Sequence, residues 1–240
     1  MSSSRPSQYR GPLSPAMAAE GIALARKNAA RLIADAELLL ENERLPSAAA
    51  LAILAIEELG KVQIIKRIVL HSDDAKQLKE AWKEYRSHRA KNVMWILPKL
   101  VSEGATTMMQ LRQATEIDGD HTAMLDSVKQ LSFYTDCFTE KARWSEPGEA
   151  VDAPFAPAIL ATARLLNRET ATSERELELW VEYLAPHYAK PTMGDALLAF
   201  QRRLFDEGLT SKSPETLEAF VRGTPVPVTK ADKSGSSEDR

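Results

Sequence analysis

The sequence contains one cysteine and four histidines, and several common catalytic motifs are missing from it. Cys137 cannot form a disulfide within the chain, and no cysteine or histidine pairs stand at zinc-binding spacing. We therefore expect neither a metal nor another cofactor. The sequence also has no Walker loop, HExxH, GxSxG or catalytic-cysteine arrangement. These absences argue against nucleotide hydrolysis, zinc-peptidase activity and serine-hydrolase activity.

Long apolar runs are missing as well. No stretch approaches the roughly 18 uninterrupted apolar residues of a membrane span, and no apolar core follows the opening Met-Ser-Ser-Ser-Arg-Pro. A signal peptide and a membrane helix are therefore not expected. Together with the single cysteine, this composition favours a soluble, cytoplasmic protein.

The chain has no overall positive charge. Its 31 lysines and arginines stand against 34 aspartates and glutamates, which gives a formal charge of −3 over 240 residues. Affinity for a phosphate backbone comes mostly from clustered Lys and Arg side chains that release counterions. Binding to RNA would therefore require a local basic patch.

What the sequence does contain is helical periodicity. Apolar residues recur every three or four positions between prolines and glycines, which predicts an all-α protein without a convincing strand. Capping residues and prolines predict helices near residues 15–41, 47–70, 73–82 and 120–143, one that ends near 168 after Pro154 and Pro157, and further helix starts at Ser173, Thr192 and Ser213. Residues 86–99 either continue the helix at 73–82 or begin another, with a break or kink at Pro98. We expect a flexible lead-in (1–13), a helical bundle (14–168), a C-terminal helical extension (169–222) and a disordered tail (223–240).

The first candidate site lies in the predicted helix 47–70. At 100° per residue, Glu57 and Lys61 fall on its apolar side, and their i, i+4 spacing predicts an ion pair along the helix. Glu58 lies about a quarter-turn away. A charge within an apolar stripe is costly unless it is partnered. The pair is therefore either a buried contact that fixes helix register or part of a polar site between helices, with Lys61 facing an anion.

The second candidate site is the basic cluster Tyr85-Arg-Ser-His-Arg-Ala-Lys-Asn92. One reading is a solvated basic face. The other is a histidine, His88, that exchanges a proton near neutral pH beside cations that hold phosphate. Arg86 would be the bidentate donor and Lys91 a point charge. Asn92 lies on the same side of a helix as His88.

A third stretch runs from Lys129 to Asp136. Lys129 and Asp136 share one side of the predicted helix at i and i+7, and Tyr134 would place its hydroxyl at the edge of the core. Alone, this stretch predicts no particular chemistry.

Together the three stretches resemble the AbiV-type abortive-infection proteins, a bacterial anti-phage group within the all-helical HEPN superfamily. The matching residues are Ala52-Ile-Leu-Ala-Ile-Glu57-Glu58-Leu-Gly60-Lys61, then Arg86-Ser-His88-Arg-Ala-Lys91, then Lys129 through Tyr134-Thr-Asp136 to Trp144 and Pro147. The resemblance covers about residues 16–166. It implies a HEPN-like helical bundle that forms a homodimer, here with additional C-terminal helices. Many HEPN proteins are metal-independent endoribonucleases in defence or toxin–antitoxin systems.

The resemblance also implies roles for individual residues. The catalytic set would be His88, Arg86, Glu57 and Lys61, the RNA-binding set Arg89, Lys91, Asn92, Lys129 and Tyr134, and the supporting residues Glu58 and Asp136. His88 would act as acid or base while cations stabilise charge on the phosphate. The usual HEPN signature has four to six residues between an arginine and its histidine, whereas one residue separates Arg86 from His88.

Three functional hypotheses follow. The first is an anti-phage protein that attacks host RNA or translation and is controlled by an antitoxin or a phage-derived trigger protein. The second is a non-catalytic HEPN-like module that grips a protein or ribosomal partner, with Glu57, Lys61 and His88 as a polar core network. The third is a regulatory adaptor that uses the helices after Ser173. Convergence of these side chains on an open groove would favour chemistry, and a sealed network would favour a structural role.

Overall fold

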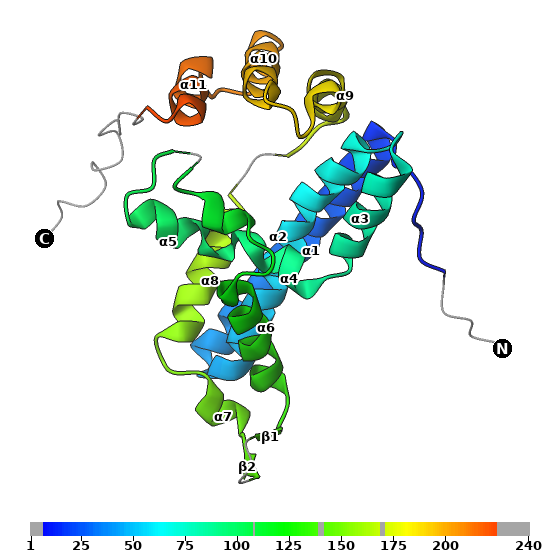
Figure 1. Cartoon of the computed structure of the whole chain (residues 1–240). Coiled ribbons are helices and arrows are strands. Elements are labelled where there is room, and N and C mark those ends of the chain that lie inside the picture. The colour runs from blue at the N-terminus through cyan, green and yellow to red at the C-terminus, as the bar shows by residue number, and fades with distance from the viewer. Residues whose placement is uncertain (1–6, 108, 139–141, 169–170, 225–240) are drawn as a thin grey trace, which may run out of the picture.

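The computed structural model describes residues 7–107, 109–138, 142–168 and 171–224, and most of these are folded into helices (Figure 1). The elements are α1 (Pro15–Glu41), α2 (Leu45–Leu70), α3 (Ala75–Tyr85), α4 (His88–Asn92), the short 3-10 helix η1 (Val93–Ile96), α5 (Leu97–Ser102), η2 (Arg112–Thr115), α6 (Asp120–Phe133), the strands β1 (Cys137–Phe138) and β2 (Arg143–Trp144), α7 (Pro147–Ala150), α8 (Phe155–Leu166), α9 (Glu174–Leu184), η3 (Ala185–His187), α10 (Met193–Asp206) and α11 (Pro214–Arg222). The predicted all-α class is confirmed. Beyond residue 224, the tail predicted to be disordered lies outside the described residues.

Two long helices, α1 and α2, form the centre of the bundle. The side chain of Ser14 caps α1 by accepting a hydrogen bond from the Met17 N–H at 3.2 Å, and Pro15 opens the helix, as predicted. Alanines on both helices are fully buried where the two meet, which allows the backbones to approach closely. The helix α2 also contacts α3, α4, α6, α8 and α9, so most of the chain is organised around it.

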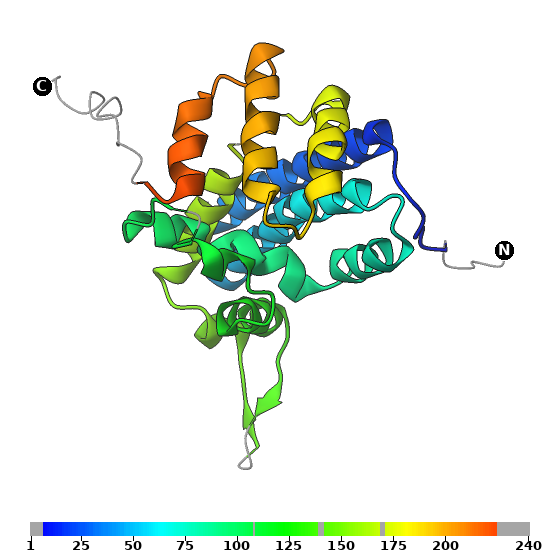
Figure 2. The same ribbon diagram turned by 45° about the horizontal axis from the view of Figure 1, so that its top comes forward.

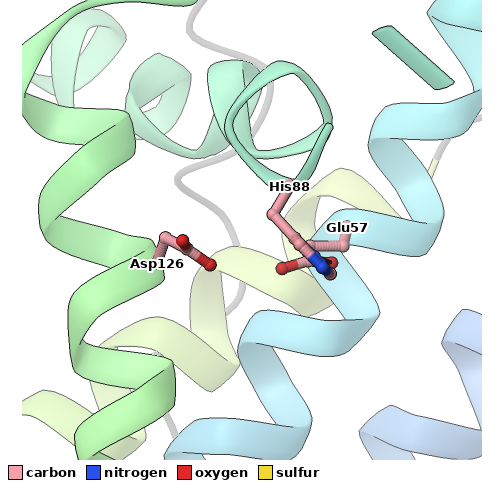
Figure 3. Close-up of side chains that lie close together, drawn as sticks. All are labelled: Glu57, His88 and Asp126. Carbon is pink, nitrogen blue, oxygen red and sulfur yellow. Dashed lines mark hydrogen bonds and ion pairs between the residues drawn. The ribbon is translucent and has the colours of Figure 1, made fainter. Parts of the chain in front are cut away.

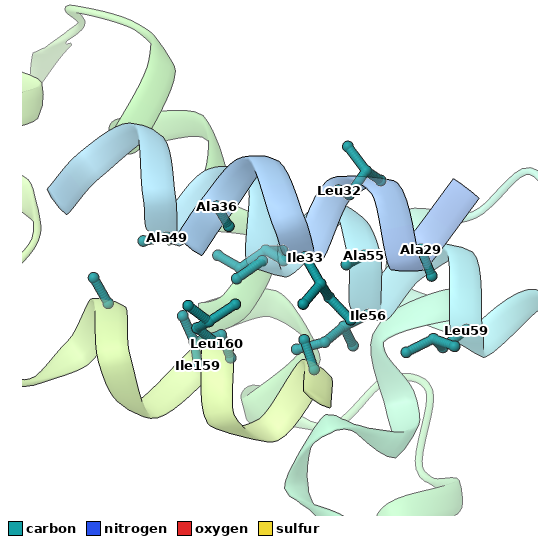
Figure 4. Packing of buried hydrophobic residues seen from close by; sticks show 14 of the residues in the cluster. Ala29, Leu32, Ile33, Ala36, Ala49, Ala55, Ile56, Leu59, Ile159 and Leu160 are labelled. Carbon is teal, nitrogen blue, oxygen red and sulfur yellow. The ribbon is translucent and has the colours of Figure 1, made fainter. Parts of the chain in front are cut away.

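The largest apolar cluster joins α1 and α2 to α8 and α6 (Figure 4). Ile33, Ile56 and Leu160 are buried in it, and α6 contributes the fully buried side chain of Leu125. Burying an aliphatic side chain of this size contributes about 1.5–3 kcal/mol. The cluster therefore fixes α6 and α8 on α2, the helix that carries the candidate site.

The segment between α3 and α5 is broken into short helices. Ser87 caps α4, since its hydroxyl accepts a hydrogen bond from the Ala90 N–H at 3.3 Å, and this cap makes His88 the first residue of α4. Pro98 lies in the first turn of α5, where its missing N–H has no helical partner to lose. The predicted break near Pro98 is therefore present, as a helix start.

The predicted helix over 120–143 is wrong in its second half. α6 ends at Phe133, and Tyr134 is already extended, with φ −123° and ψ 139°. The stretch from Phe133 onward is rich in aromatic and β-branched residues, which suit a strand. Cys137 and Phe138 pair antiparallel with Trp144 and Arg143, and this short hairpin projects from the bundle (Figure 2).

The C-terminal helices pack on the central pair. Ser173 caps α9 by accepting from the Glu176 N–H at 3.1 Å, while the Glu176 carboxylate accepts a hydrogen bond from Lys66 of α2 at 2.8 Å. The indole N–H of Trp180 donates to the Lys66 carbonyl at 3.1 Å. Leu177 is fully buried in a cluster formed by α1, α2 and α9. The extension is thus docked on the bundle through α9, and α10 and α11 follow alongside it (Figures 1 and 2).

The lead-in is predicted to be flexible over residues 1–13, yet its described part lies against α3. The Trp82 indole N–H donates to the Gly11 carbonyl at 2.9 Å, Arg86 donates to the Tyr9 carbonyl at 3.1 Å, and the Ser72 hydroxyl donates to the Leu13 carbonyl at 3.1 Å. These bonds hold residues 8–13 in place. Of the helices in the described part of the chain, none is both long and apolar enough to span a membrane.

The alanine packing between α1 and α2 gives a matched test. Ala29 is fully buried in the main cluster, while the next residue, Ala30, is exposed. We expect Ala29→Leu to lower the free energy of unfolding by about 1–3 kcal/mol, because the extra methylenes would force the helices apart. Ala30→Leu should change it by less than about 0.5 kcal/mol. Urea unfolding followed by circular dichroism measures both, and equal effects would contradict the packing described here.

Candidate functional site

The carboxylate of Glu57 is buried in the middle of α2, with 3% of the residue exposed. Its Oε1 lies 2.5 Å from the Lys129 ammonium on α6, and its Oε2 lies 2.6 Å from Nδ1 of His88 on α4. The Lys91 ammonium is 3.5 Å from the same Oε2. One carboxylate thus joins three helices. We call Glu57, His88, Lys91, Asp126 and Lys129 the Glu57 network.

Gly60 determines how closely α4 can approach this carboxylate. A Cβ atom at position 60 would lie 1.8 Å from the carbonyl oxygen of Lys91. This distance is far shorter than van der Waals contact, so no residue with a side chain fits at this position. The absence of a side chain therefore lets the α4 backbone rest directly on α2. Because Gly60 follows Glu57 by three residues, both lie on the same face of α2, the face that α4 covers.

Lys129 is the central cation of the network. Its ammonium lies 2.5 Å from Glu57, 2.8 Å from Asp126 and 3.2 Å from Nδ1 of His88, and the side chain is 5% exposed. The predicted RNA-binding role of Lys129 does not match this position, because the ammonium is enclosed between carboxylates. Asp126, one turn earlier on α6, is a site residue that the sequence did not indicate.

His88 is the exposed member of the network, with 51% of its side chain accessible. An unprotonated Nδ1 would direct its lone pair at the carboxylate oxygen 2.6 Å away, which is repulsive. We therefore infer that Nδ1 carries the proton and donates a hydrogen bond to Glu57. Nε2 is then the ring atom available to accept a proton from a ligand. An imidazole oriented in this way by a buried carboxylate is geometrically suited to general acid–base chemistry.

The surroundings of Lys91 disfavour its charged form. Desolvation by burial lowers the pKa of Lys91, the charges of Lys61 and Lys129 lower it further, and Glu57 opposes these effects. The folded chain therefore binds this proton less tightly than the unfolded chain. A phosphate placed near Lys91 would stabilise the charged ammonium.

Three atoms of the network also match a metal-ligand set. Ligand atoms of Glu57, His88 and Asp126 lie within 4.8 Å of one another, as these residues converge from α2, α4 and α6 (Figure 3). The Lys129 ammonium contacts all three of these residues. A metal ion would have to displace or neutralise it, so the donor set fits a resident ammonium better than a divalent cation.

The predicted Glu57–Lys61 pair is wrong. The Lys61 ammonium instead donates to Glu58 at 2.6 Å and lies 5.6 Å from the centre of the Tyr85 ring. Glu57 and Glu58 both lie on α2, but the Glu57 carboxylate faces α4 and α6. Its partners there, His88 and Lys129, take the place of Lys61 on its own helix. Lys61 and Glu58 are each about one-fifth exposed and lie at the edge of this site.

Arg86 lies beside the network rather than in it. Its guanidinium donates to the Gln8 side chain and to the carbonyls of Tyr9 and Trp82. With Lys61 and Lys91 it lines a cavity of about 420 Å³. Arg86 thus lies near Lys61 and Lys91, while its hydrogen bonds go to the lead-in segment and α3.

The remaining predicted residues are dispersed. Asn92 is fully buried, with neither side-chain amide atom hydrogen-bonded, and Arg89 is half-buried, so Asn92 has no surface to offer RNA. Tyr134 is 62% exposed at the end of α6. The Asp136 carboxylate accepts from the Cys137 N–H at 2.7 Å and so shapes the hairpin.

Comparison with known proteins identifies one family. The HEPN family model described as AbiV matches residues 17–168, which span α1 to α8. No curated protein and no solved structure matches the chain.

The network predicts unequal roles for two lysines. Lys129→Met would leave the buried carboxylate of Glu57 and the partly exposed carboxylate of Asp126 without their main cation, and we expect it to lower the free energy of unfolding by about 3–5 kcal/mol. Lys61→Met removes a partly exposed pair and should cost less than about 1 kcal/mol. Denaturant unfolding of both variants tests the assignment, and a larger loss for Lys61→Met would restore the pairing that the sequence predicts.

Two helical glycines make a second matched test. Gly21 on α1 has ordinary space for a Cβ, with Ile65 3.7 Å away, so Gly21→Ala should stabilise the protein by up to about 1 kcal/mol. Gly60→Ala should destabilise it, because α4 would have to move off α2. Melting temperatures that rise for Gly21→Ala and fall for Gly60→Ala are the expected result. A stabilising Gly60→Ala would show that the close approach of α4 is not needed.

Proposed function

The chain belongs to the AbiV family of HEPN proteins, a family of abortive-infection proteins, and on that premise we propose that it is a metal-independent endoribonuclease acting on host RNA. The observation that carries the proposal is the half-exposed imidazole of His88, held at Nδ1 by the buried carboxylate of Glu57. Such a pair is suited to moving a proton at Nε2.

The proposed reaction is transesterification. Nε2 of His88 takes the proton of a ribose 2′-hydroxyl, and the 2′ oxygen forms a bond to the adjacent phosphorus. The bond from phosphorus to the 5′ oxygen breaks, and that oxygen leaves with a proton from a general acid. The products are a 2′,3′-cyclic phosphate and a 5′-hydroxyl end. Glu57 stabilises the imidazolium that forms, much as a carboxylate does in other histidine-based sites.

Cations near His88 would stabilise the reacting phosphate. Lys91 is the best-placed candidate, because its ammonium approaches Glu57 and its side chain lines the neighbouring cavity, whereas Lys129 is enclosed between carboxylates. One imidazole cannot act as base and acid at the same moment. A homodimer, which the family resemblance implies, would bring a second His88 and supply both groups.

The burial of the network favours one alternative function. Glu57 and Lys129 are almost wholly enclosed, which is what a purely structural ion pair also requires. In this alternative the protein is a non-catalytic module that grips a protein or ribosomal partner. In either case we propose that the protein acts in the bacterial cytoplasm and is controlled by an antitoxin or a phage-derived trigger protein.

Cleavage of RNA without metal is the direct test. Purified full-length wild-type protein should cut total bacterial RNA in EDTA and leave 2′,3′-cyclic phosphate ends. His88→Ala should abolish cleavage while changing stability by no more than about 1 kcal/mol, since Glu57 keeps Lys129 and Lys91 as partners. The control is His187→Ala, because His187 lies in η3 and is bonded to Thr192, away from the network.

The outcomes separate the alternatives. Cleavage by wild type and His187→Ala but not by His88→Ala supports the proposal. Equal cleavage by all three, or no cleavage by any, would contradict it, and the second result would favour the binding module. Activity that appears only after a divalent cation is added would redirect attention to Glu57, His88 and Asp126 as metal ligands.

A further inference from the structure

Two neighbouring hollows lie along α3, beside the Glu57 network. The first, of about 420 Å³, is lined by Lys61, Arg86 and Lys91 together with aromatic side chains. The second, of about 490 Å³, is lined by Arg10, Lys79 and Lys83 among others. Arg86 and Trp82 line both, so the two hollows are neighbours on either side of these two residues.

The charge of these hollows is strongly one-sided. Six cationic side chains line them, and the lining residues include one carboxylate, Glu80. The Glu80 carboxylate lies 3.6 Å from the Lys83 ammonium. Because the Lys83 side chain is 79% exposed, this ion pair is weak. Lys61 and Lys91 are also paired with Glu58 and Glu57 of α2, and a chain of net charge −3 still gathers its other lining cations, Arg10, Lys79, Lys83 and Arg86, along these hollows. This is the local patch that binding of a polyanion demands.

Helix geometry arranges the cations in a row. Lys79, Lys83 and Arg86 are spaced at i, i+4 and i+7, so they share one face of α3. Seven residues of helix advance by about 10 Å. At one end of this row, Lys91 lines the first hollow and also approaches Glu57. The row therefore leads from the outer surface of α3 toward the Glu57 network.

Aromatic side chains accompany the cations. Tyr9, Trp82 and Tyr85 line the first hollow. Tyr9 meets Trp82 edge-on at 6.1 Å, and Arg86 lies 5.5 Å from the Trp82 ring centre. Single-stranded nucleic acids are bound by this combination, in which cations follow the backbone and aromatic rings contact bases.

We propose that the two hollows form a single groove that binds single-stranded RNA and guides it to His88. The proposal rests on the function proposed above, for which it names the path of the substrate. Phosphates lie against Arg10, Lys79 and Lys83 at the outer end and against Lys61 and Lys91 at the inner end. Arg10 places the lead-in segment in the groove wall, so this segment is part of the binding surface.

Binding can be measured separately from cleavage. The probe is a short fluorescent single-stranded RNA whose 2′-hydroxyls are replaced by fluorine, so that transesterification has no nucleophile. Lys79→Gln with Lys83→Gln removes two exposed cations from the groove. The matched control is Lys27→Gln with Arg31→Gln, which removes the same charge from exposed positions on α1, outside both hollows. Fluorescence anisotropy over a series of salt concentrations gives the affinity of each protein.

The groove pair should bind the probe roughly ten-fold more weakly than wild type at low salt, because two phosphate contacts are lost. The slope of log affinity against log salt should fall by about 1.4, and the control pair should bind within about two-fold of wild type. Equal losses for both pairs, or no loss for the groove pair, would overturn the groove. So would a lack of binding by wild type, or tighter binding of a glutamate-rich peptide of equal charge.

The same proteins distinguish failure of the groove from failure of the proposed function. If His88→Ala abolishes cleavage of natural RNA while the groove pair binds as wild type does, the nuclease stands and the groove is wrong. If the groove pair alone loses binding but wild type cuts no RNA, the groove stands and the catalytic proposal is wrong.

Discussion

A single buried carboxylate, that of Glu57, holds three helices in register. It accepts a hydrogen bond from His88 on α4 and one from Lys129 on α6, while the carboxylate itself belongs to α2. Breaking a buried pair by removing one partner leaves an uncompensated charge, which is more costly than any single apolar contact in the bundle. The helices cannot shift by a turn without creating such a charge. The position of the imidazole is therefore fixed by the same interaction that fixes the packing.

The residues of the segment Glu57-Glu58-Leu-Gly60-Lys61 make different contacts on two sides of α2. Glu57 and Gly60 face α4, one as the ion-pair partner and the other as the point of closest approach. Glu58 and Lys61 pair with each other at the edge of the neighbouring cavity. One turn of helix thus contributes both to the Glu57 network and to the wall of the neighbouring cavity. This geometry accounts for the presence of a glutamate, a glycine and a lysine within five residues of α2.

Much of the fold could be predicted from the sequence, because helix caps and periodicity are local signals. Ser14 and Ser173 cap the helices that they were expected to cap. The hairpin after Phe133 was missed because helical periodicity continued past the point where strand-forming residues take over. The expectation that the chain is helical therefore held better than the expected helix boundaries.

The candidate site was predicted less completely, because its contacts join distant parts of the chain. Glu57 and His88 were singled out in separate stretches of the sequence, and the structure brings them together across 31 positions. The partner of Glu57 was misassigned to Lys61, the nearest cation on the same helix, since sequence spacing shows neighbours on one helix but not those on another. Lys129 was identified but given a surface role, and Asp126 carried no signal of its own.

Because α9 packs on α1 and α2, the folded unit extends beyond the part of the chain that matches the family. The family match ends at residue 168, yet Leu177 and Trp180, beyond that limit, cover apolar residues of α1 and α2. A chain cut at the end of the match would expose Val62, Ile65 and Val69 to water. The family boundary therefore does not mark an independent domain. In this protein the added helices are part of the hydrophobic core, and relatives without them would need another way to cover that face.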